Sequence, residues 1–255
     1  MKILLTAINA KYIHSNLAVY NLRAYATHYA KGMADTDTVE IGEYTINNQM
    51  EDILEGIYKA KPDVLMFSCY IWNIAFVEEL AEEFHKLRPE VPIWVGGPEV
   101  SYETESFLRE HPQITGVMIG EGEKTFCELA EYYAGKSRSD KETEEKQRTQ
   151  ETQGTGESKS TEEKSKLGAI TGIAYRNGNE IVFTAPREML NLSEIPFCYD
   201  KAGDFRNRII YYESSRGCPF SCSYCLSSVE KQLRFRDTEL VKKNCSFLLT
   251  GKCHR

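Results

Sequence analysis

Three closely spaced cysteines late in the chain are the residues most capable of chemistry. They are Cys218, Cys222 and Cys225, with spacing Cys-x3-Cys-x2-Cys, and the apolar run 208–212 before them is expected to be a strand. Thiolates this close together hold a metal, and a loop allows backbone N–H groups to reach cluster sulfurs. Three ligands leave one coordination position open, so an iron there would be a reactive centre. On spacing alone, a zinc site or a two-electron thiol switch is the alternative.

The cysteine loop, with Tyr224 just before its third cysteine and a strand leading into it, resembles the radical S-adenosylmethionine (SAM) enzymes. The resemblance implies a [4Fe–4S] cluster whose unligated iron chelates SAM, with Tyr224 packed near the adenosine. An electron from the cluster would cleave SAM to methionine and a 5′-deoxyadenosyl radical, which abstracts hydrogen from a substrate. An electron donor such as flavodoxin or ferredoxin is the implied partner.

Composition limits the classes of partner. The net charge of −7 offers no basic surplus to neutralise phosphates, which argues against nucleic acid. Eight cysteines without a signal peptide favour a reducing cytoplasm. The apolar N-terminus, residues 1–8, is too short to span a membrane, so we expect a buried strand there and no membrane partner.

From residue 1 to 136, short apolar runs alternate with amphipathic segments. The runs are residues 3–8, 38–41, 64–67, 93–95 and 117–119. This alternation is typical of a parallel sheet covered on both faces by helices. We therefore predict an α/β fold, a flavodoxin-like doubly wound parallel sheet.

Ligands of such sheets bind at the carboxyl ends of the strands, so the loops there are the candidate binding residues. They carry polar groups and glycines that allow a ligand to approach the backbone closely. No Gly-x-Gly-x-x-Gly follows the first strand, which argues against a dinucleotide. The candidates are Asn9, His14, Ser68, Gly96, Gly97, Glu99, Gly120 and Gly122.

Two of these loops, Gly-Gly-Pro-Glu at 96–99 and Gly-Glu-Gly-Glu at 120–123, resemble the cobalamin-binding domain that precedes the radical domain in one group of radical SAM proteins. The resemblance covers residues 1 to about 136 and resumes at about 168. It implies that the candidate loops hold cobalamin. The Asp-x-His-x-x-Gly motif that supplies a lower axial histidine elsewhere is missing, because Tyr12 and Leu17 flank His14 instead. A domain that kept the shape and lost the ligand is the alternative.

The rest of the chain divides into three segments. Residues 137–167 are almost entirely polar, and we expect a disordered linker. In 168–207, Asn177-Gly178 between two β-rich runs predicts a β-hairpin that bridges to the radical domain. Residues 208–255 would be the first β/α piece of a radical SAM barrel, with one helix from Thr238 to about Lys243, and the barrel is expected to be truncated. Additional ligation by Cys245, Cys253 and His254 is a less regular alternative.

Two classes of function follow. The first is a radical SAM enzyme with a cobalamin domain that methylates or rearranges an unknown substrate, expected to be inactive or nearly so as this truncated chain. The second is a cobalamin- or metal-binding module without turnover. A tRNA methylthiotransferase is a subsidiary alternative, but Cys69 and Cys127 are too few for the cluster cysteines that its first domain would carry.

Overall fold

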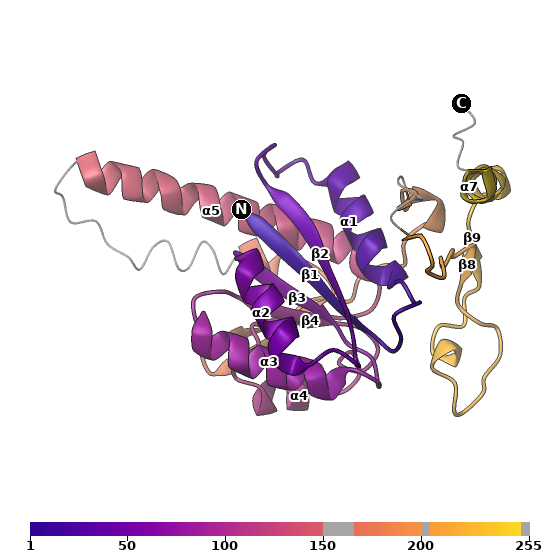
Figure 1. Ribbon diagram of the computed structural model, residues 1–255, viewed down its shortest axis with the longest axis horizontal. Coiled ribbons are helices and arrows are strands. Elements are labelled where there is room, and N and C mark those ends of the chain that lie inside the picture. Colours follow the sequence, from indigo (N-terminus) through magenta and orange to yellow (C-terminus); the bar gives the residue numbers. More distant parts are fainter. Residues whose placement is uncertain (150–165, 200–204, 251–255) are drawn as a thin grey trace.

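The computed structural model describes residues 1–149, 166–199 and 205–250, with the backbone alone at 141–149 and 228. Five strands of the sheet are parallel to one another (Figure 1): β1 (Lys2–Asn9), β2 (Thr38–Thr45), β3 (Val64–Ser68), β4 (Ile93–Gly96) and β5 (Gly116–Met118). Their order, β2-β1-β3-β4-β5, places the reversal of strand order between β1 and β3. This is the flavodoxin-like order, so the predicted α/β class and doubly wound topology are confirmed for this part of the chain.

Helices cover both faces of the sheet (Figure 1). On one face lie α1 (Leu17–Tyr29) and α5 (Gly122–Thr149), and on the other α2 (Met50–Ala60), α3 (Ile74–Leu87) and α4 (Thr104–Glu110). Two apolar cores result because strand side chains alternate between faces. In β1, Ile3 and Leu5 pack toward α1 and α5, whereas Leu4 and Ile8 pack toward α2 and α3. Each fully buried aliphatic side chain contributes roughly 2 kcal/mol from removal of apolar surface from water.

The predicted hairpin is confirmed, and it extends the sheet. Strands β6 (Ile173–Asn177) and β7 (Glu180–Phe183) pair antiparallel around a turn in which Gly178 has a φ of 64°. β6 also pairs antiparallel with β5, which gives a mixed sheet of seven strands. The hairpin therefore covers the β5 edge of the first domain instead of standing apart as a bridge.

The prediction of a disordered linker from residue 137 is wrong for residues 137–149. Helix α5 continues to Thr149. Its first half is anchored in the core by Phe126 and Leu129, so the cost of nucleating the helix is already met there. Glu, Lys, Arg and Gln in the second half are good helix formers, which lets the helix propagate without an apolar face. The remainder of the predicted linker up to residue 165 lies outside the described residues.

The segment that carries the cysteines differs from the predicted start of a barrel. Residues 208–212 form no strand; they make a single bridge, Ile209 with His14, beside the β1–α1 loop. The strands found instead are the two-residue β8 (Ser215–Arg216) and β9 (Arg234–Phe235), paired antiparallel. Single-turn 3₁₀ helices span Leu192–Glu194 and Leu226–Ser228. A barrel piece is thus not found in the described residues.

Helix α7 (Thr238–Thr250) is longer than predicted, because its second half is anchored by packing. The ring of Phe247 meets that of Phe197 edge-on at 5.4 Å, and Leu248 packs against the core. The described helices include none with both the length and the apolar character that a membrane span needs.

Candidate functional site

A cavity of about 480 Å³ opens where the parallel strands end, at the edge of the sheet at which doubly wound folds bind ligands. Side chains from α1 and from the ends of β3, β4 and β5 form its wall. Apolar surface outweighs polar surface in its lining, which suits a large ligand with an apolar body. The lining includes Leu17, Asn21, Leu22, Met66, Ser68, Tyr70, Gly96, Gly97, Tyr102, Met118 and Gly120–Glu123.

Gly97 and Gly120 are glycines for different structural reasons. Gly97 has a φ of 124°, and a Cβ there would collide with the carbonyl oxygen of Cys69, so the close approach of two loops requires glycine. Gly120 has a φ of 79°, and a Cβ there would meet nothing within 4 Å. The backbone at Gly120 therefore leaves open space beside the cavity, which fits the presence of a bulky ligand.

Glu43, on β2, organises the loop between β1 and α1. Its carboxylate accepts hydrogen bonds from the Asn9 side chain at 3.1 Å and from the Tyr20 hydroxyl at 2.6 Å, and pairs with Arg208 at 2.5 Å. It also accepts a bond from the backbone N–H of Asn16, whose side chain caps α1 through Val19 N–H. The pKa of Tyr20 is raised, mainly because its hydroxyl is buried and in addition because that hydroxyl is hydrogen-bonded to Glu43. Glu43 therefore connects the β1–α1 loop of the first domain to Arg208.

Asn9 and His14 do not line the cavity, which differs from the sequence-based expectation. Asn9 donates to the His14 carbonyl at 3.1 Å as well as to Glu43. The His14 ring stacks on Tyr211 with centroids 5.8 Å apart, and Nδ1 of His14 is hydrogen-bonded to the Tyr211 hydroxyl. Both residues are thus engaged in holding the loop against residues 208–211. Glu99 is exposed and is also outside the lining.

Ser68, Gly96, Gly97, Gly120 and Gly122 do line the cavity, as the sequence predicts. Ser68 accepts a hydrogen bond from the Asn16 side chain at 3.0 Å, which joins the loops after β1 and β3. The structure therefore brings together five of the eight candidate loop residues.

The cysteine segment lies against this same edge of the sheet. Glu213, Arg216 and Glu230, which flank the cysteines in the sequence, form part of the cavity wall. Arg216 reaches across to the residues that follow β5 and pairs with Glu121 at 2.9 Å and with Glu123, in the first turn of α5, at 2.8 Å. The cavity is therefore shared between the sheet domain and the segment that carries the cysteines.

The three cysteines lie on one irregular loop that begins at Gly217. Gly217 has a φ of 91°, and a Cβ there would collide with the Gln232 carbonyl oxygen. The backbone N–H of Cys218 donates to the Glu230 carbonyl at 2.9 Å, which fixes the start of the loop. Cys222 is exposed, and Cys218 and Cys225 are half-buried. Tyr224 is 91% exposed and lies outside the cavity lining.

Within the described ranges, no three His, Cys, Asp or Glu side chains converge in a geometry that could hold a metal ion. The assignment of Cys218, Cys222 and Cys225 as cluster ligands therefore stays a prediction. Cys69, Cys127 and Cys198 are buried in the sheet domain and its covering loops. Burial raises the pKa of Cys127 and of Cys198 to about 12, so these thiols stay protonated at neutral pH. They behave as packing residues.

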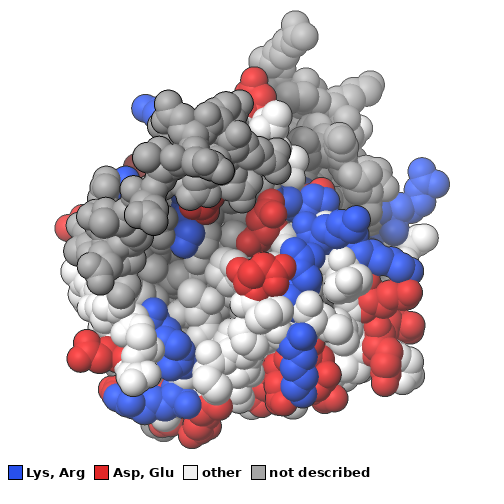
Figure 2. Space-filling view, turned by 90° about the vertical axis from the view of Figure 1, so that its left-hand side faces the viewer, with Lys and Arg blue, Asp and Glu red and all other residues white. Residues whose placement is uncertain are grey.

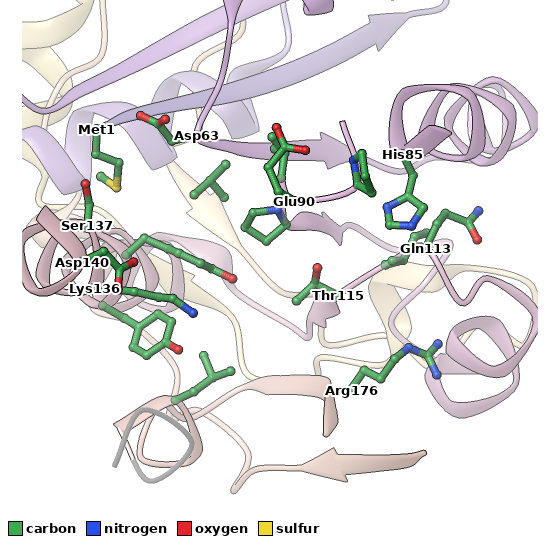
Figure 3. A pocket seen from close by; sticks show the side chains of 18 of the residues that line it. Met1, Asp63, His85, Glu90, Gln113, Thr115, Lys136, Ser137, Asp140 and Arg176 are labelled. Carbon is green, nitrogen blue, oxygen red and sulfur yellow. The ribbon is translucent and has the colours of Figure 1, made fainter. Parts of the chain in front are cut away.

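A larger cavity, about 790 Å³, lies at the opposite edge of the sheet (Figure 3). Its labelled residues include Met1, Asp63 and Thr115 just before parallel strands, His85 in the last turn of α3, and Arg176 near the carboxyl end of the antiparallel strand β6. Figure 2 views the molecule from the side on which the chain begins and shows a hollowed face with acidic and basic side chains interspersed. The smaller cavity is the better candidate, because it lies at the carboxyl ends of the strands, next to the cysteine segment.

Sequence reasoning missed the charged residues that join the two parts: Glu43, Arg208, Arg216 and Arg234. Glu43 and Arg208 are 165 positions apart, and Glu121 and Arg234 are 113 apart, so no local pattern announces either pair. The available signal was the position of Arg216, two residues before the first cysteine of the loop.

Together, the fold and the cavity at its switch point define a ligand-binding α/β domain with a cysteine-bearing segment docked over its ligand edge. The model of the B12 binding domain matches residues 3–130, and the chain belongs to this family. Over most of its length it is also related to cobalamin-dependent radical SAM enzymes.

Two curated relatives are similar to this chain over most of its length. The cobalamin-dependent radical SAM methyltransferase TokK of Streptomyces tokunonensis is 26% identical over 187 residues, which cover 69% of this chain and 23% of TokK. The 2-(S-pantetheinyl)-carbapenam-3-carboxylate methyltransferase of Streptantibioticus cattleyicolor is 26% identical over 235 residues, 87% of this chain and 30% of that protein. The chain thus spans less than a third of either relative.

The solved structure of the cobalamin-dependent SAM radical enzyme OxsB, with aqua-cobalamin and SAM bound, has a similar fold, with a TM-score of 0.67. It is 19% identical, and the match covers 97% of this chain and 31% of the OxsB chain. At this level of identity the similarity bears on the fold alone.

Proposed function

We propose that this chain is the cobalamin-binding and cluster-bearing part of a radical SAM methyltransferase. The observation that carries the proposal is the shared cavity: a domain of the B12-binding family and the Cys-x3-Cys-x2-Cys segment meet at one edge of the sheet, and Glu213, Arg216 and Glu230 stand in the wall. The names of the matched relatives favour methyl transfer over rearrangement.

The cavity suits cobalamin through its shape and lining. Gly120 leaves open space beside the cavity, and Leu17, Leu22 and Met118 offer an apolar wall to a large planar ring. Ser68, Gly96, Gly97 and Gly122 also line the cavity, and polar edges of the cofactor would lie against them. When bound, cobalamin supplies a carrier for a methyl group, and a [4Fe–4S] cluster supplies the electron that activates SAM.

Cys218, Cys222 and Cys225 would hold the cluster. The half-buried and exposed thiols share a loop whose start is fixed by Gly217 and by the Cys218 N–H bond to Glu230. A metal site commonly assembles only with its metal, since the ligands must lose their protons and converge. Convergence of the three thiolates on iron is therefore part of the proposal. Flavodoxin or ferredoxin would deliver the electron.

Anaerobic iron–sulfur reconstitution of the full chain tests this function. We expect cluster absorbance in the wild type and its loss in Cys222→Ala, whereas Cys245→Ser, a half-buried cysteine in α7, keeps the cluster. Titration with hydroxocobalamin should show saturable binding. A colourless, iron-poor protein, or one that holds tetrahedral zinc, would contradict the radical-enzyme assignment.

An assay for 5′-deoxyadenosine in the presence of SAM and a strong reductant then separates enzyme from binding module. SAM cleavage supports the enzyme. Cluster and cobalamin binding without cleavage would favour the module without turnover.

A further inference from the structure

Arg216 forms ion pairs with three glutamates at the cavity wall. Its guanidinium pairs with Glu121 at 2.9 Å in the loop after β5, with Glu123 at 2.8 Å in the first turn of α5, and with Glu213 at 2.6 Å in its own segment. The Arg216 side chain is 18% exposed. A planar guanidinium shared by three carboxylates has one orientation that satisfies all of them, so the arginine is held in place.

Arg234 makes the same kind of contact from the other end of the cysteine loop. Arg216 and Arg234 face each other as partners in the β8–β9 ladder, and the three cysteines lie in the chain between them. Arg234 pairs with Glu121 and Glu230, and donates to the Leu190 carbonyl at 2.6 Å. Both ends of the cysteine loop are therefore fastened to the carboxylates that follow β5.

Those same carboxylates belong to the cavity wall. Glu121, Gly122 and Glu123 all line the cavity, and Glu123 is buried in the first turn of α5. A ligand that fills the cavity therefore lies against the side chains that hold the loop. In addition, Glu213, Arg216 and Glu230 line the cavity from the cysteine segment.

The effect of losing Arg216 depends on the carboxylate that it would leave without a partner. Within the part of the chain that the structure describes, the ion pair of Glu123 is with Arg216. Without the guanidinium, a buried carboxylate loses its partner, which costs more than the ion pair contributes. The cheapest relief is for Glu123 to take up water, which requires the β8–β9 ladder to lift from the wall.

We infer that Arg216 and Arg234 are positioning residues that fasten the cysteine loop to the cavity wall, so that filling of the cavity and closure of the loop favour each other. The identity of the ligand, cobalamin, rests on the proposed function. The fastening itself rests on the ion pairs. By thermodynamic linkage, a ligand that binds the closed loop more tightly than the open loop lowers the equilibrium population of the open loop by the ratio of the two affinities.

Hydrogen exchange of the full chain, prepared anaerobically without iron and with thiols reduced, measures both sides of this linkage. In the wild type, saturating hydroxocobalamin should slow exchange across residues 213–236 by about fivefold or more. Arg216→Met should exchange fast in that segment with or without hydroxocobalamin. Its Kd for hydroxocobalamin should rise by the same factor by which the ligand protects the wild type.

Arg187→Met is the matched control. Arg187 also pairs with a glutamate of α5, Glu128, and its side chain is 7% exposed, but it lines neither the cavity nor the cysteine loop. It should lower stability while keeping the wild-type protection of residues 213–236 by hydroxocobalamin. A purely structural role for Arg216 would make the two variants alike in that protection, and would overturn the inference.

If Arg216→Met does not melt cooperatively, Glu123→Gln replaces it, because it removes the charge and keeps the side-chain shape. Wild-type protection and Kd in the tested variant would refute the coupling. If the wild type binds no hydroxocobalamin, the proposed function fails and the coupling with it. The fastening is still decided by ligand-free exchange of 213–236, which should be faster in Arg216→Met than in Arg187→Met.

Discussion

Substitution of Gly120 tests whether the cavity at the carboxyl edge of the sheet is the cobalamin site. Gly120 has a φ of 79° and Gly178 a φ of 64°, and a Cβ at either position would meet nothing within 4 Å. Gly120→Ala and Gly178→Ala therefore carry the same kind of backbone strain without a clash. They differ in that Gly120 lines the cavity, whereas Gly178 stands at the hairpin turn outside it.

The expected magnitudes follow from this matched geometry. An alanine held at positive φ costs about 1 kcal/mol after the gain from a stiffer unfolded chain. For a chain of this size, that lowers Tm by roughly 2–4 °C in both variants. An extra methyl group in a closely fitting pocket costs about 1–3 kcal/mol of binding free energy, so Gly120→Ala should weaken cobalamin binding by about tenfold or more. Gly178→Ala should leave binding at the wild-type level.

Thermal unfolding and titration of hydroxocobalamin by its absorbance provide both measurements on the same samples. Equal losses of Tm establish that the two substitutions are matched. If Gly120→Ala then binds hydroxocobalamin as tightly as Gly178→Ala, the cofactor does not lie against Gly120, and this cavity is not its site.

Three other predictions concern single side chains. Gly97→Ala should lower stability more than Gly120→Ala, because its Cβ collides with the backbone of Cys69 in addition to the strain at positive φ; chemical denaturation of the two variants provides the comparison. At pH 8, iodoacetamide should modify Cys222, which is exposed, and spare Cys127, whose pKa burial raises to about 12, as peptide mass spectrometry would show; equal labelling in the folded protein would contradict the described burial. Burial raises the pKa of the Glu121 carboxyl, but the hydrogen bonds and charges of its two arginines outweigh burial and leave the pKa below 4.5. The contribution of Glu121 to stability is therefore present above that pH and lost as pH falls further, so the difference in stability between wild type and Glu121→Gln should disappear in acid. A difference that persists in acid would refute the ion-pair account.

The parts of the fold that local patterns encode could be predicted from the sequence. The nearly continuous apolar run 3–8 predicted a strand buried on both faces, and Asn177-Gly178 predicted the hairpin turn. Whether the hairpin pairs with β5 is decided by a tertiary contact that local patterns do not carry. The end of α5 was misjudged, because low apolar content was read as disorder although the residues themselves favour a helix.

The candidate site was predictable where loop position decides it and not where long-range pairing does. Ser68 ends β3 and Gly120 follows β5, and both strands end at the same edge of the sheet, so their place at the cavity follows from topology. Asn9 ends β1 and His14 follows it at the same edge, yet their side chains bond to Glu43 and Tyr211, which come from distant parts of the chain. The hydrogen-bond partner of such a polar side chain is set by long-range contacts, which exist only in the folded chain.

Helix α5 links the rim of the cavity to a remote point on the molecule. It starts at Gly122 in the cavity wall and runs for 28 residues to Thr149, a length of about 42 Å at 1.5 Å per residue. A fluorophore or surface-attachment tag placed at the far end of this helix would stand well clear of any bound corrinoid. Immobilised protein for surface-based affinity measurements could therefore be oriented with the ligand entrance pointing into solution.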